Sequence, residues 1–495
     1  MTDLVVDIAT PLPHRISGRR PNQLFICGSC FHKSHRLRAL EIEADGNGEA
    51  VTAHGMPRPE LVAAAGARAY RSGFWGFVTL PAIEADRSVA IDLVATLDDA
   101  TRMRVPLASV DLVAGRGDGD STAVARTAIC MATYEPPADL LERQIESIRR
   151  QTDEDWICLI SDDNSSPQRL SGLESLIAGD PRFVLSRSDR RRGFFHNFER
   201  ALEMVPASAE FVALADQDDY WYPEKLAVLL SNIGDAPLIY SDAQVVTGDG
   251  RVLSPTYWDR RRNNSSNFAS LLLANTVSGA AALFRREVVD VGLPFPPAFG
   301  KLFHDHWLAL VGATLGEIAF VDRPLYDYVQ HERALLGHER AQAWADPGRG
   351  LGERLRDFRD RPQYFYEHWR TTYFQEYCRI SLLARLLLAR REQQLLPSRR
   401  RLLHRFVDME RSPGAIAWLA ARQARALAGR DETLGAEGRL LRAFLWRRLL
   451  EAQSKRPSTV RARLPMGGDF PVDRVGPIAP APLPSAPAVT TERSQ

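Results

Sequence analysis

Three carboxylates fall within four positions of one short segment, Asp216-Gln-Asp-Asp219, directly after an apolar run that ends at Ala215. Two like charges about 4 Å apart repel by about 1 kcal/mol in water and by about 4 kcal/mol at an effective dielectric of about 20. A divalent cation offsets this repulsion, and Mg²⁺ or Mn²⁺ takes one or two carboxylates plus substrate phosphate oxygens. Asp216 and Asp218 therefore suit a metal-bridged diphosphate. The alternative is a solvated acidic turn before a helix expected near Pro223.

Two further polar clusters follow apolar runs that read as strands. Thr133-Tyr-Glu135 follows the first run, and Asp162-Asp-Asn-Ser-Ser166 follows the second. Each cluster alone could simply form a turn or cap the N-terminus of a helix. The carboxyl ends of parallel strands share one crevice, however, so the three clusters together predict a nucleotide site. There a carboxylate would accept a base N–H, hydroxyls would meet the ribose and the metal would meet the phosphates.

The elements that must position these residues alternate between strand and helix from Arg126 onward. Such alternation predicts an α/β domain with a mixed, mainly parallel sheet and helices on both faces. The segments before it are β-rich and separated by turn residues, which predicts a small β-sandwich. The Arg/Leu-rich segments after it predict helices. We expect a sandwich at residues 1–118, a catalytic domain at 122–338, a helical basic region at 339–456 and a disordered Pro/Ala-rich tail at 457–495.

Composition narrows the classes of function. The 495 residues include 63 Lys and Arg against 62 Asp and Glu, so no global field indicates nucleic acid. Five cysteines make no disulfide framework, and Cys27-Gly-Ser-Cys30 is expected as a turn between strands rather than a metal site. No signal peptide or membrane span is expected. These features predict a cytoplasmic protein, whose basic C-terminal helices either rest on the inner membrane surface or present ordinary solvated faces.

An ordered set of motifs resembles the family 2 glycosyltransferases with the nucleotide-diphospho-sugar fold, over about residues 124 to 338. The sequence of the acidic segment, followed downstream by His304-Asp-His-Trp307 and Gln330-His331, is most similar to the rhamnosyltransferase-like branch that builds bacterial surface polysaccharides. The motifs are Met131-Ala-Thr-Tyr-Glu, Gln144-Ile-Glu-Ser-Ile-Arg-Arg-Gln, Asp162-Asp-Asn-Ser, Arg192-Gly-Phe-Phe-His-Asn-Phe-Glu-Arg-Ala-Leu, Asp216-Gln-Asp-Asp-Tyr-Trp-Tyr-Pro-Glu-Lys-Leu, Asn275-Thr-Val-Ser-Gly-Ala-Ala-Ala-Leu-Phe-Arg-Arg-Glu, His304-Asp-His-Trp and Tyr328-Val-Gln-His.

The resemblance implies roles for these residues. Asp163 would accept the base N3–H, Asp218 would be the principal metal ligand with Asp216 beside it, and Asp219 would help to hold the loop. His331 would ligate the metal or touch the diphosphate, unless it is an ordinary surface histidine. The implied nucleotide site comprises Thr133, Tyr134, Glu135, Asp163, Gly193, Asn197 and Asp216.

The resemblance also assigns the general base to Asp305, in the segment His304-Asp-His-Trp307 that should open a helix. We expect the helix dipole to keep Asp305 ionised, and the alternative is an N-cap carboxylate. His304, Trp307 and Gln330 are candidates for acceptor contact, with Trp307 either stacking on a sugar or lying in the core. The segment that begins at Glu332 departs from the pattern, because many relatives carry Asn there.

These features together predict an inverting, metal-dependent transferase that uses Mn²⁺ or Mg²⁺. Its donor would be a UDP- or dTDP-linked sugar, with rhamnose the sugar that the branch suggests. Its acceptor would be a hydroxyl of a growing surface polysaccharide or a lipid-linked glycan. The alternative is a catalytically degenerate protein that binds a glycan or nucleotide. A nucleotidyl- or phosphotransferase has less support, because the chain has no glycine-rich phosphate loop. The sandwich would scaffold the catalytic domain or, if Tyr70 and Trp75 are exposed, contact glycan.

Overall fold

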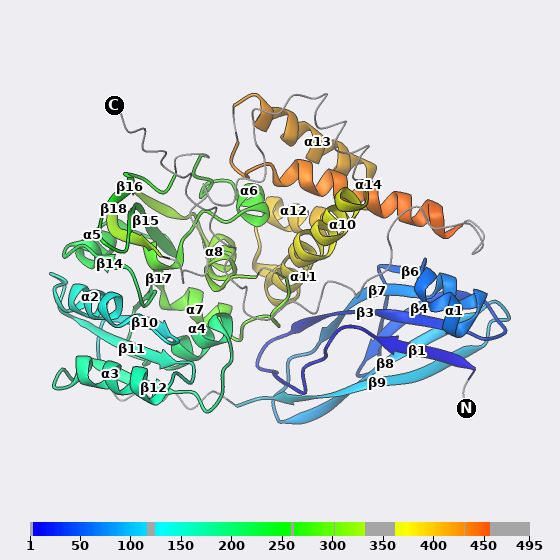
Figure 1. Cartoon of the computed structure of the whole chain (residues 1–495), viewed down its shortest axis with the longest axis horizontal. Coiled ribbons are helices and arrows are strands. Elements are labelled where there is room, and N and C mark those ends of the chain that lie inside the picture. Colours follow the sequence, from blue (N-terminus) through cyan, green and yellow to red (C-terminus); the bar gives the residue numbers. More distant parts are fainter. Residues whose placement is uncertain are drawn as a thin grey trace, which may run out of the picture.

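The computed structural model describes residues 3–115, 124–258, 262–300, 302–331, 362–429 and 431–455. A β-sandwich, an α/β domain and a group of helices follow one another along the chain (Figure 1). The boundary predicted between residues 118 and 122, the segment after His331 and the predicted tail at 457–495 lie outside the described residues.

The N-terminal part consists of two facing sheets. One has the order β1-β3-β7-β6 and the other the order β2-β9-β8-β4-β5. Three short helical segments, η1 (Pro59–Leu61), α1 (Val62–Ala65) and η2 (Ala67–Arg71), connect β6 to β7. The predicted small sandwich is confirmed. Its strands are β1 (Leu4–Ile8), β2 (Arg15–Ser17), β3 (Asn22–His32), β4 (Leu37–Ala44), β5 (Asn47–Ala50), β6 (Ala53–Met56), β7 (Gly73–Leu80), β8 (Arg87–Leu97) and β9 (Arg102–Val113).

Strand β3 is buried on both faces along its whole length, including its polar residues. Leu24, Ile26 and Cys30 pack into the core between the two sheets. Phe25 and Cys27 face the other way, into the core shared with the rest of the protein. The prediction that the Cys27–Cys30 segment forms a turn is therefore wrong. Because the two thiols point to opposite faces of one strand, they do not share a metal site.

The α/β domain is built on one nine-stranded mixed sheet. Its order is β12-β11-β10-β13-β17-β15-β18-β14, with β16 paired to β15. The strands β12, β11, β10 and β13 are mutually parallel, whereas β17 runs antiparallel to its neighbours. The strands are β10 (Thr127–Thr133), β11 (Trp156–Asp162), β12 (Phe183–Arg187), β13 (Phe211–Ala215), β14 (Tyr220–Trp221), β15 (Leu238–Thr247), β16 (Val252–Ser254), β17 (Ala282–Arg285) and β18 (Ala319–Gln330).

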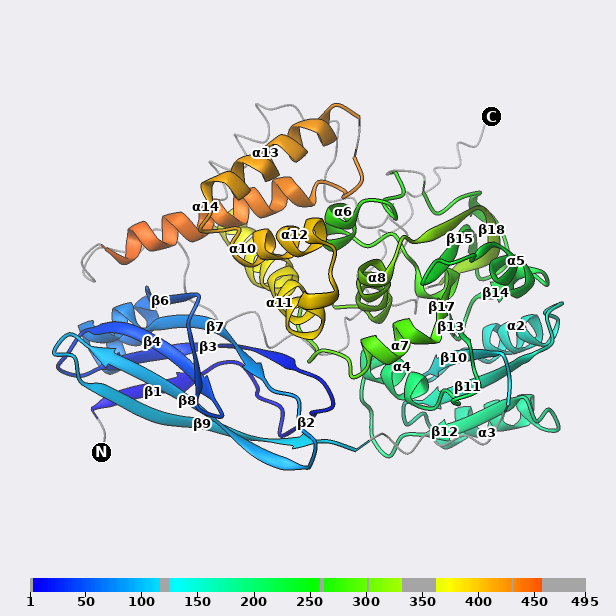
Figure 2. The ribbon, with the colours of Figure 1, turned by 180° about the vertical axis from the view of Figure 1, so that it is seen from behind.

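Helices cover both faces of this sheet, so the predicted mixed, mainly parallel α/β architecture is confirmed. Helices α2, α3 and α5 lie on one side, and α4, α7 and α8 lie on the other (Figures 1 and 2). The bounds are α2 (Ala138–Arg149), α3 (Pro167–Ile177), α4 (Phe194–Glu203), α5 (Lys225–Asn232), α6 (Phe268–Leu273), η3 (Gly279–Ala281), α7 (Arg286–Gly292) and α8 (His304–Leu315).

The C-terminal part is helical, as predicted. Arg379 on α11 and His306 on α8 connect it to the α/β domain through a buried contact of 3.0 Å between Nη1 and Nδ1. No helix in the described part of the chain has the length and apolar character that a bilayer span requires. The elements are α10 (Pro362–Thr372), the π-helical turn η4 (Tyr373–Cys378), α11 (Arg379–Arg391), η5 (Glu392–Gln394), α12 (Pro397–Val407), α13 (Pro413–Leu427) and α14 (Ala436–Ser454).

Aromatic side chains join the sandwich to the C-terminal helices. The ring of Phe374 lies 6.2 Å from Phe25, 5.2 Å from Trp75 and 5.9 Å from Trp446. Trp75 and Tyr70 are 1% and 2% exposed, so the suggestion that they are free to contact glycan is wrong. Trp75 instead donates its indole N–H to the Tyr373 hydroxyl at 3.2 Å. These contacts favour the packing role for this face of the sandwich.

We expect Phe374→Ala to lower the free energy of unfolding by about 3–5 kcal/mol, because it leaves a cavity in this shared aromatic core. Urea denaturation followed by tryptophan fluorescence measures the change. Tyr364→Ala, at a 54% exposed position on α10, is the matched control and should change stability little. Equal, small effects of the two substitutions would contradict a continuous core between the two parts.

Candidate functional site

Three strands of the α/β sheet deliver polar residues to the same edge. Thr133 at the end of β10 pairs in register with Asp162 at the end of β11, and Met131 on β10 pairs with Ala215 at the end of β13. The strands are parallel, so their carboxyl ends lie side by side. The predicted convergence of the three polar clusters therefore follows from the register of the sheet.

The acidic turn begins at Asp216, which is one residue beyond β13. Burial, Asp218 and Asp305 raise the pKa of Asp216 to about 7, while Lys225 acts in the opposite direction. Asp216 and Asp218 thus belong to one turn, whereas Asp305 comes from a helix almost ninety residues later in the sequence. The fold gathers like charges in a poorly solvated place, where they repel strongly.

Asp218 faces the end of strand β18. Its Oδ2 lies 2.9 Å from Nε2 of His331, and the two side chains remain 20% and 14% exposed. A carboxylate and an imidazole at this separation are donors that Mn²⁺ accepts, and the carboxylate also suits Mg²⁺. The residues present fit a divalent cation whose remaining ligands would be oxygens of a bound diphosphate and water.

Asp219 points inward and holds the turn. Its Oδ1 accepts from the Val329 backbone N–H at 3.2 Å, and its Oδ2 is buried with no hydrogen-bond partner among the described residues. Burial, together with Asp216 and Asp218, raises the pKa of Asp219 well above its usual range. The predicted role of Asp219 in holding the loop agrees with this contact.

Lys225 supplies a buried positive charge beneath the turn. Its ammonium donates to the Ala280 carbonyl and lies 3.5 Å from the ring centre of Trp221 and 4.7 Å from that of Tyr326. Burial lowers the pKa of Lys225 well below its usual range, while Asp219 and Asp216 act to raise it. When protonated, Lys225 thus offsets part of the charge of the turn and acts to lower the pKa of Asp216.

Gln217 joins the acidic turn to the first strand end. Its side-chain oxygen accepts from the Tyr134 N–H at 2.8 Å, and its Nε2 donates to the Tyr134 carbonyl at 3.3 Å. The side chain of Tyr134 is 37% exposed, and the guanidinium of Arg191 lies 4.1 Å from its ring centre. Arg191 therefore lies over one face of this ring, and stacking of a base on Tyr134 stays a prediction.

Asp305 lies in the first turn of α8, as predicted. Burial raises the pKa of Asp305 to about 6, although hydrogen bonds from His306, Gly279 and Asn275 act to lower it. The His306 N–H donates to Oδ1 at 2.6 Å. The expectation that the helix dipole sets the charge of Asp305 therefore needs correction, because burial is the largest influence. A pKa of about 6 suits a general base that works near neutral pH.

Similarity to known proteins agrees with this geometry. Residues 128–293 match the model described as "Glycosyl transferase family 2". The α/β domain is a family 2 glycosyltransferase domain.

Two uncharacterised glycosyltransferases are similar to parts of the chain. The one from Methanocaldococcus jannaschii is 26% identical over 129 residues, which are 25% of this chain and 44% of that protein. The one from Nostoc sp. is 25% identical over 203 residues, which are 39% of this chain and 62% of that protein. The chain thus spans less than two thirds of the length of these relatives.

Two solved structures are also similar to the chain. One is S. aureus TarS 1-349 in complex with UDP-GlcNAc, with 15% identity and a TM-score of 0.37 over 66% of this chain and 92% of that one. The other is the mannosyltransferase PcManGT from Pyrobaculum calidifontis in complex with GDP-Man and Mn²⁺. It has 16% identity and a TM-score of 0.33 over 68% of this chain and 89% of that one.

Several predicted nucleotide residues of the glycosyltransferase domain hold the crevice together. Both oxygens of Asp163 accept backbone N–H groups, from Arg192 at 2.6 Å and Gly193 at 2.8 Å. Gly193 has φ +82°, a left-handed conformation that favours glycine, and it places this N–H just before α4. Each Asp163 oxygen retains one lone pair, so contact with a base stays a prediction.

Asn197 and Glu135 also have protein partners. Asn197 donates to the carbonyls of Thr133 and Ser161 at 3.2 and 2.8 Å, so it ties the ends of β10 and β11 together. The Glu135 carboxylate accepts from the N–H and hydroxyl of Ser166, at the start of α3. For these two residues the structure shows scaffolding contacts, and direct contact with the donor stays a prediction.

The three candidate acceptor residues differ in position. Trp307 has no exposed surface and donates its indole N–H to the Gly292 carbonyl at 2.8 Å, so the suggestion that it stacks on a sugar is wrong. His304 is 8% exposed and stacks on Phe198 with ring centres 3.7 Å apart. Gln330 ends β18 next to His331, near the acidic turn. Gln330 is half-buried, and its Nε2 is shielded without a hydrogen-bond partner among the described residues, so its contact with an acceptor stays a prediction.

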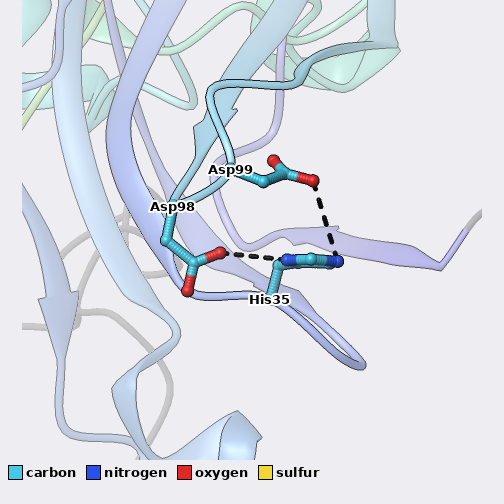
Figure 3. A group of neighbouring side chains, drawn as sticks. All are labelled: His35, Asp98 and Asp99. Atoms are coloured by element: carbon cyan, nitrogen blue, oxygen red, sulfur yellow. Dashed lines mark hydrogen bonds and ion pairs between the residues drawn. The ribbon is translucent and has the colours of Figure 1, made fainter.

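A different His and Asp cluster lies on the sandwich. His35, Asp98 and Asp99 are described residues whose ligand atoms all lie within 4.8 Å of one another. Figure 3 shows the imidazole between the two carboxylates, with Nδ1 3.0 Å from Asp98 and Nε2 3.8 Å from Asp99. Because opposite ring nitrogens face different carboxylates and all three side chains are exposed, this arrangement is that of a surface ion pair.

Residues that the sequence analysis missed complete the site of the glycosyltransferase domain. Lys225 and Gln217 stand within a quoted motif, but a lysine at the start of a helix usually indicates a solvated face. Gly279 is also required, because a Cβ at that position would lie 2.9 Å from Nε2 of His304 and 3.4 Å from Cβ of Asp305. No signal in the sequence links this glycine to a helix that begins twenty-five residues later.

The raised pKa of Asp216 predicts a pH-dependent stability in the absence of metal. A folded-state pKa near 7 means that the folded chain binds a proton that the unfolded chain releases near pH 4. Ionised Asp216 therefore costs stability as the pH rises from about 4 to about 7, and the cost is complete above that window. With EDTA present, we expect Asp216→Asn to stabilise the chain by on the order of 2 kcal/mol at pH 8 and by much less at pH 4.5.

Urea denaturation at the two pH values measures this difference. Asp322→Asn, at an exposed position on β18 of the same sheet, is the control and should show no such trend. An Asp216→Asn effect that is the same at both pH values would show that the carboxylate is not held in a charged, poorly solvated cluster.

Proposed function

We propose that the chain is a glycosyltransferase that moves a sugar from a nucleoside-diphosphate donor to a hydroxyl of an acceptor, with a divalent cation, Mn²⁺ or Mg²⁺, at Asp218. The observation that carries the proposal is that Asp218 and Asp305 both lie close enough to Asp216 for their charges to act on it, at the carboxyl edge of the sheet. A lone acidic turn would not bring in a half-buried carboxylate from α8.

The residues divide into a donor side and an acceptor side. Asp218 and His331 would hold the cation, with Asp216 toward the cation or the ribose. When bound, the cation supplies positive charge that stabilises the departing diphosphate. Tyr134, with Thr133, Glu135, Asp163, Gly193 and Asn197 around it, forms the nucleotide side, where Tyr134 offers an exposed ring.

Asp305 is the proposed general base. The acceptor oxygen forms a bond to the anomeric carbon while the bond from that carbon to the diphosphate oxygen breaks. The proton of the acceptor hydroxyl passes to Asp305, and the electron pair of the broken bond leaves with the nucleoside diphosphate. This is a single displacement that inverts the anomeric configuration. The pKa of about 6 leaves Asp305 mostly ionised at neutral pH, as a base must be.

The finer assignments extend the resemblance in the motifs. We propose a UDP- or dTDP-linked donor, with rhamnose as the first sugar to test, and a growing surface polysaccharide or lipid-linked glycan as acceptor. Gln330 is the candidate for acceptor contact. The proposed location is the cytoplasm, with peripheral contact of the basic helices at the inner membrane surface. The alternative function is binding of a glycan or nucleotide without turnover.

We expect metal-dependent release of nucleoside diphosphate when the chain is incubated with UDP- and dTDP-sugars and Mn²⁺ or Mg²⁺. Asp218→Ala should abolish the release. Asp305→Asn should lower transfer to an acceptor by at least about 100-fold while donor binding persists, because only the proton acceptor is lost. Asp249→Asn, in the exposed turn between β15 and β16, is the control and should retain wild-type rates.

Two outcomes would decide against the proposal. Release that is unaffected by EDTA and by Asp218→Ala would contradict a metal-assisted departure of the diphosphate. Binding of glycan or nucleotide with no turnover of any donor sugar would instead support the alternative function.

A further inference from the structure

A second candidate site lies between the sandwich and the C-terminal helices. A cavity of about 410 Å³ is lined on one side by strands β4, β5 and β6 and on the other by α14 and the residues just before α13. Helix α14 passes over β6 in both views (Figures 1 and 2). None of the lining residues belongs to the acidic turn, so this cavity is separate from the site described above.

The cavity is polar, and positive side chains outnumber negative ones. Arg411, Arg447 and Arg448 line it together with Glu410 and Glu451. Two of the arginines have hydrogen-bond partners. Arg411 donates to the Thr52 carbonyl at 2.8 Å, and Arg448 donates to the Glu410 carbonyl at 3.1 Å.

Arg447 differs from its two neighbours. Its side chain is 12% exposed, and its Nε and Nη1 are buried without a hydrogen-bond partner among the described residues. The guanidinium lies 5.2 Å from the ring centre of Trp75, and Glu451 is 3.6 Å from Nη1, beyond hydrogen-bond distance. Buried hydrogen-bond donors almost always have partners, and the ion pair of Arg447 with Glu451 still leaves Nε and Nη1 without a hydrogen bond among the described residues.

We propose that this cavity binds a small anionic ligand, with a carboxylate or phosphate group accepting from Arg447. The planar guanidinium is suited to the oxygens of these two groups, and the volume lies in the range of small-molecule sites. His54 on β6 lines the same cavity, where burial and the charge of Arg447 lower its pKa. Because residues of the sandwich and of the C-terminal helices both line the cavity, a bound anion would also hold these two parts together.

Isothermal titration calorimetry of the full chain with inorganic phosphate, and separately with glucuronate, tests the proposal, and glucose is the neutral control. We expect one of the anions to bind and glucose not to bind, and the tighter anion identifies the group. Arg447→Gln should weaken that binding at least about tenfold. Arg442→Gln, at an exposed position on the same helix, should leave it unchanged, and both variants should retain donor turnover.

Binding of neither anion, equal binding of glucose, or unchanged anion binding by Arg447→Gln would overturn the proposal. A measurement on the wild-type chain keeps the test independent of how the variant folds. The anion that binds should raise the pKa of His54, followed by NMR with His54→Gln for assignment, because it opposes the charge of Arg447. An unchanged pKa at saturating phosphate and glucuronate would also overturn the proposal.

Discussion

Repulsion among carboxylates in a poorly solvated crevice is the constraint on which the rest of the site depends. Burial raises the pKa of Asp216, and the charges of nearby Asp218 and Asp305 raise it further. Buried Lys225 offsets part of this cost, but one cation faces several carboxylates. Such an arrangement is stable with all groups ionised only if further positive charge arrives. A divalent cation carried in with a diphosphate would supply that charge.

The fold places these groups by combining distant parts of the chain. The acidic turn follows strand β13, and Asp305 lies on α8. His331 follows the end of β18 and lies beside Asp218. Between them, Gln217 fixes the turn to the end of β10, and Asp163 fixes the loop before α4. Most of the polar residues at this edge thus hold backbone in place, whereas Tyr134 and Asp218 keep exposed surface.

Much of this could be predicted from the sequence, because periodicity and strand-end chemistry are local signals. The alternation after Arg126 indicated the mixed sheet, and the position of Asp216 just after an apolar run located the acidic turn. The predictions that failed concern the burial of side chains, which depends on what packs against each residue in the fold. Trp307 and Trp75 are aromatic side chains whose sequence context fits either a core or a glycan surface, and the structure buries both. Lys225 was missed because nothing local indicates that a lysine will lie beneath a carboxylate turn.

Anomalous scattering from crystals of the chain grown with Mn²⁺ and UDP tests most directly whether a divalent cation binds at Asp218. We expect a manganese peak within bonding distance of Asp218, near His331 and Asp216, with a diphosphate oxygen on its other side. Bound UDP with no manganese at Asp218, or manganese found only beside His35, Asp98 and Asp99, would contradict this expectation.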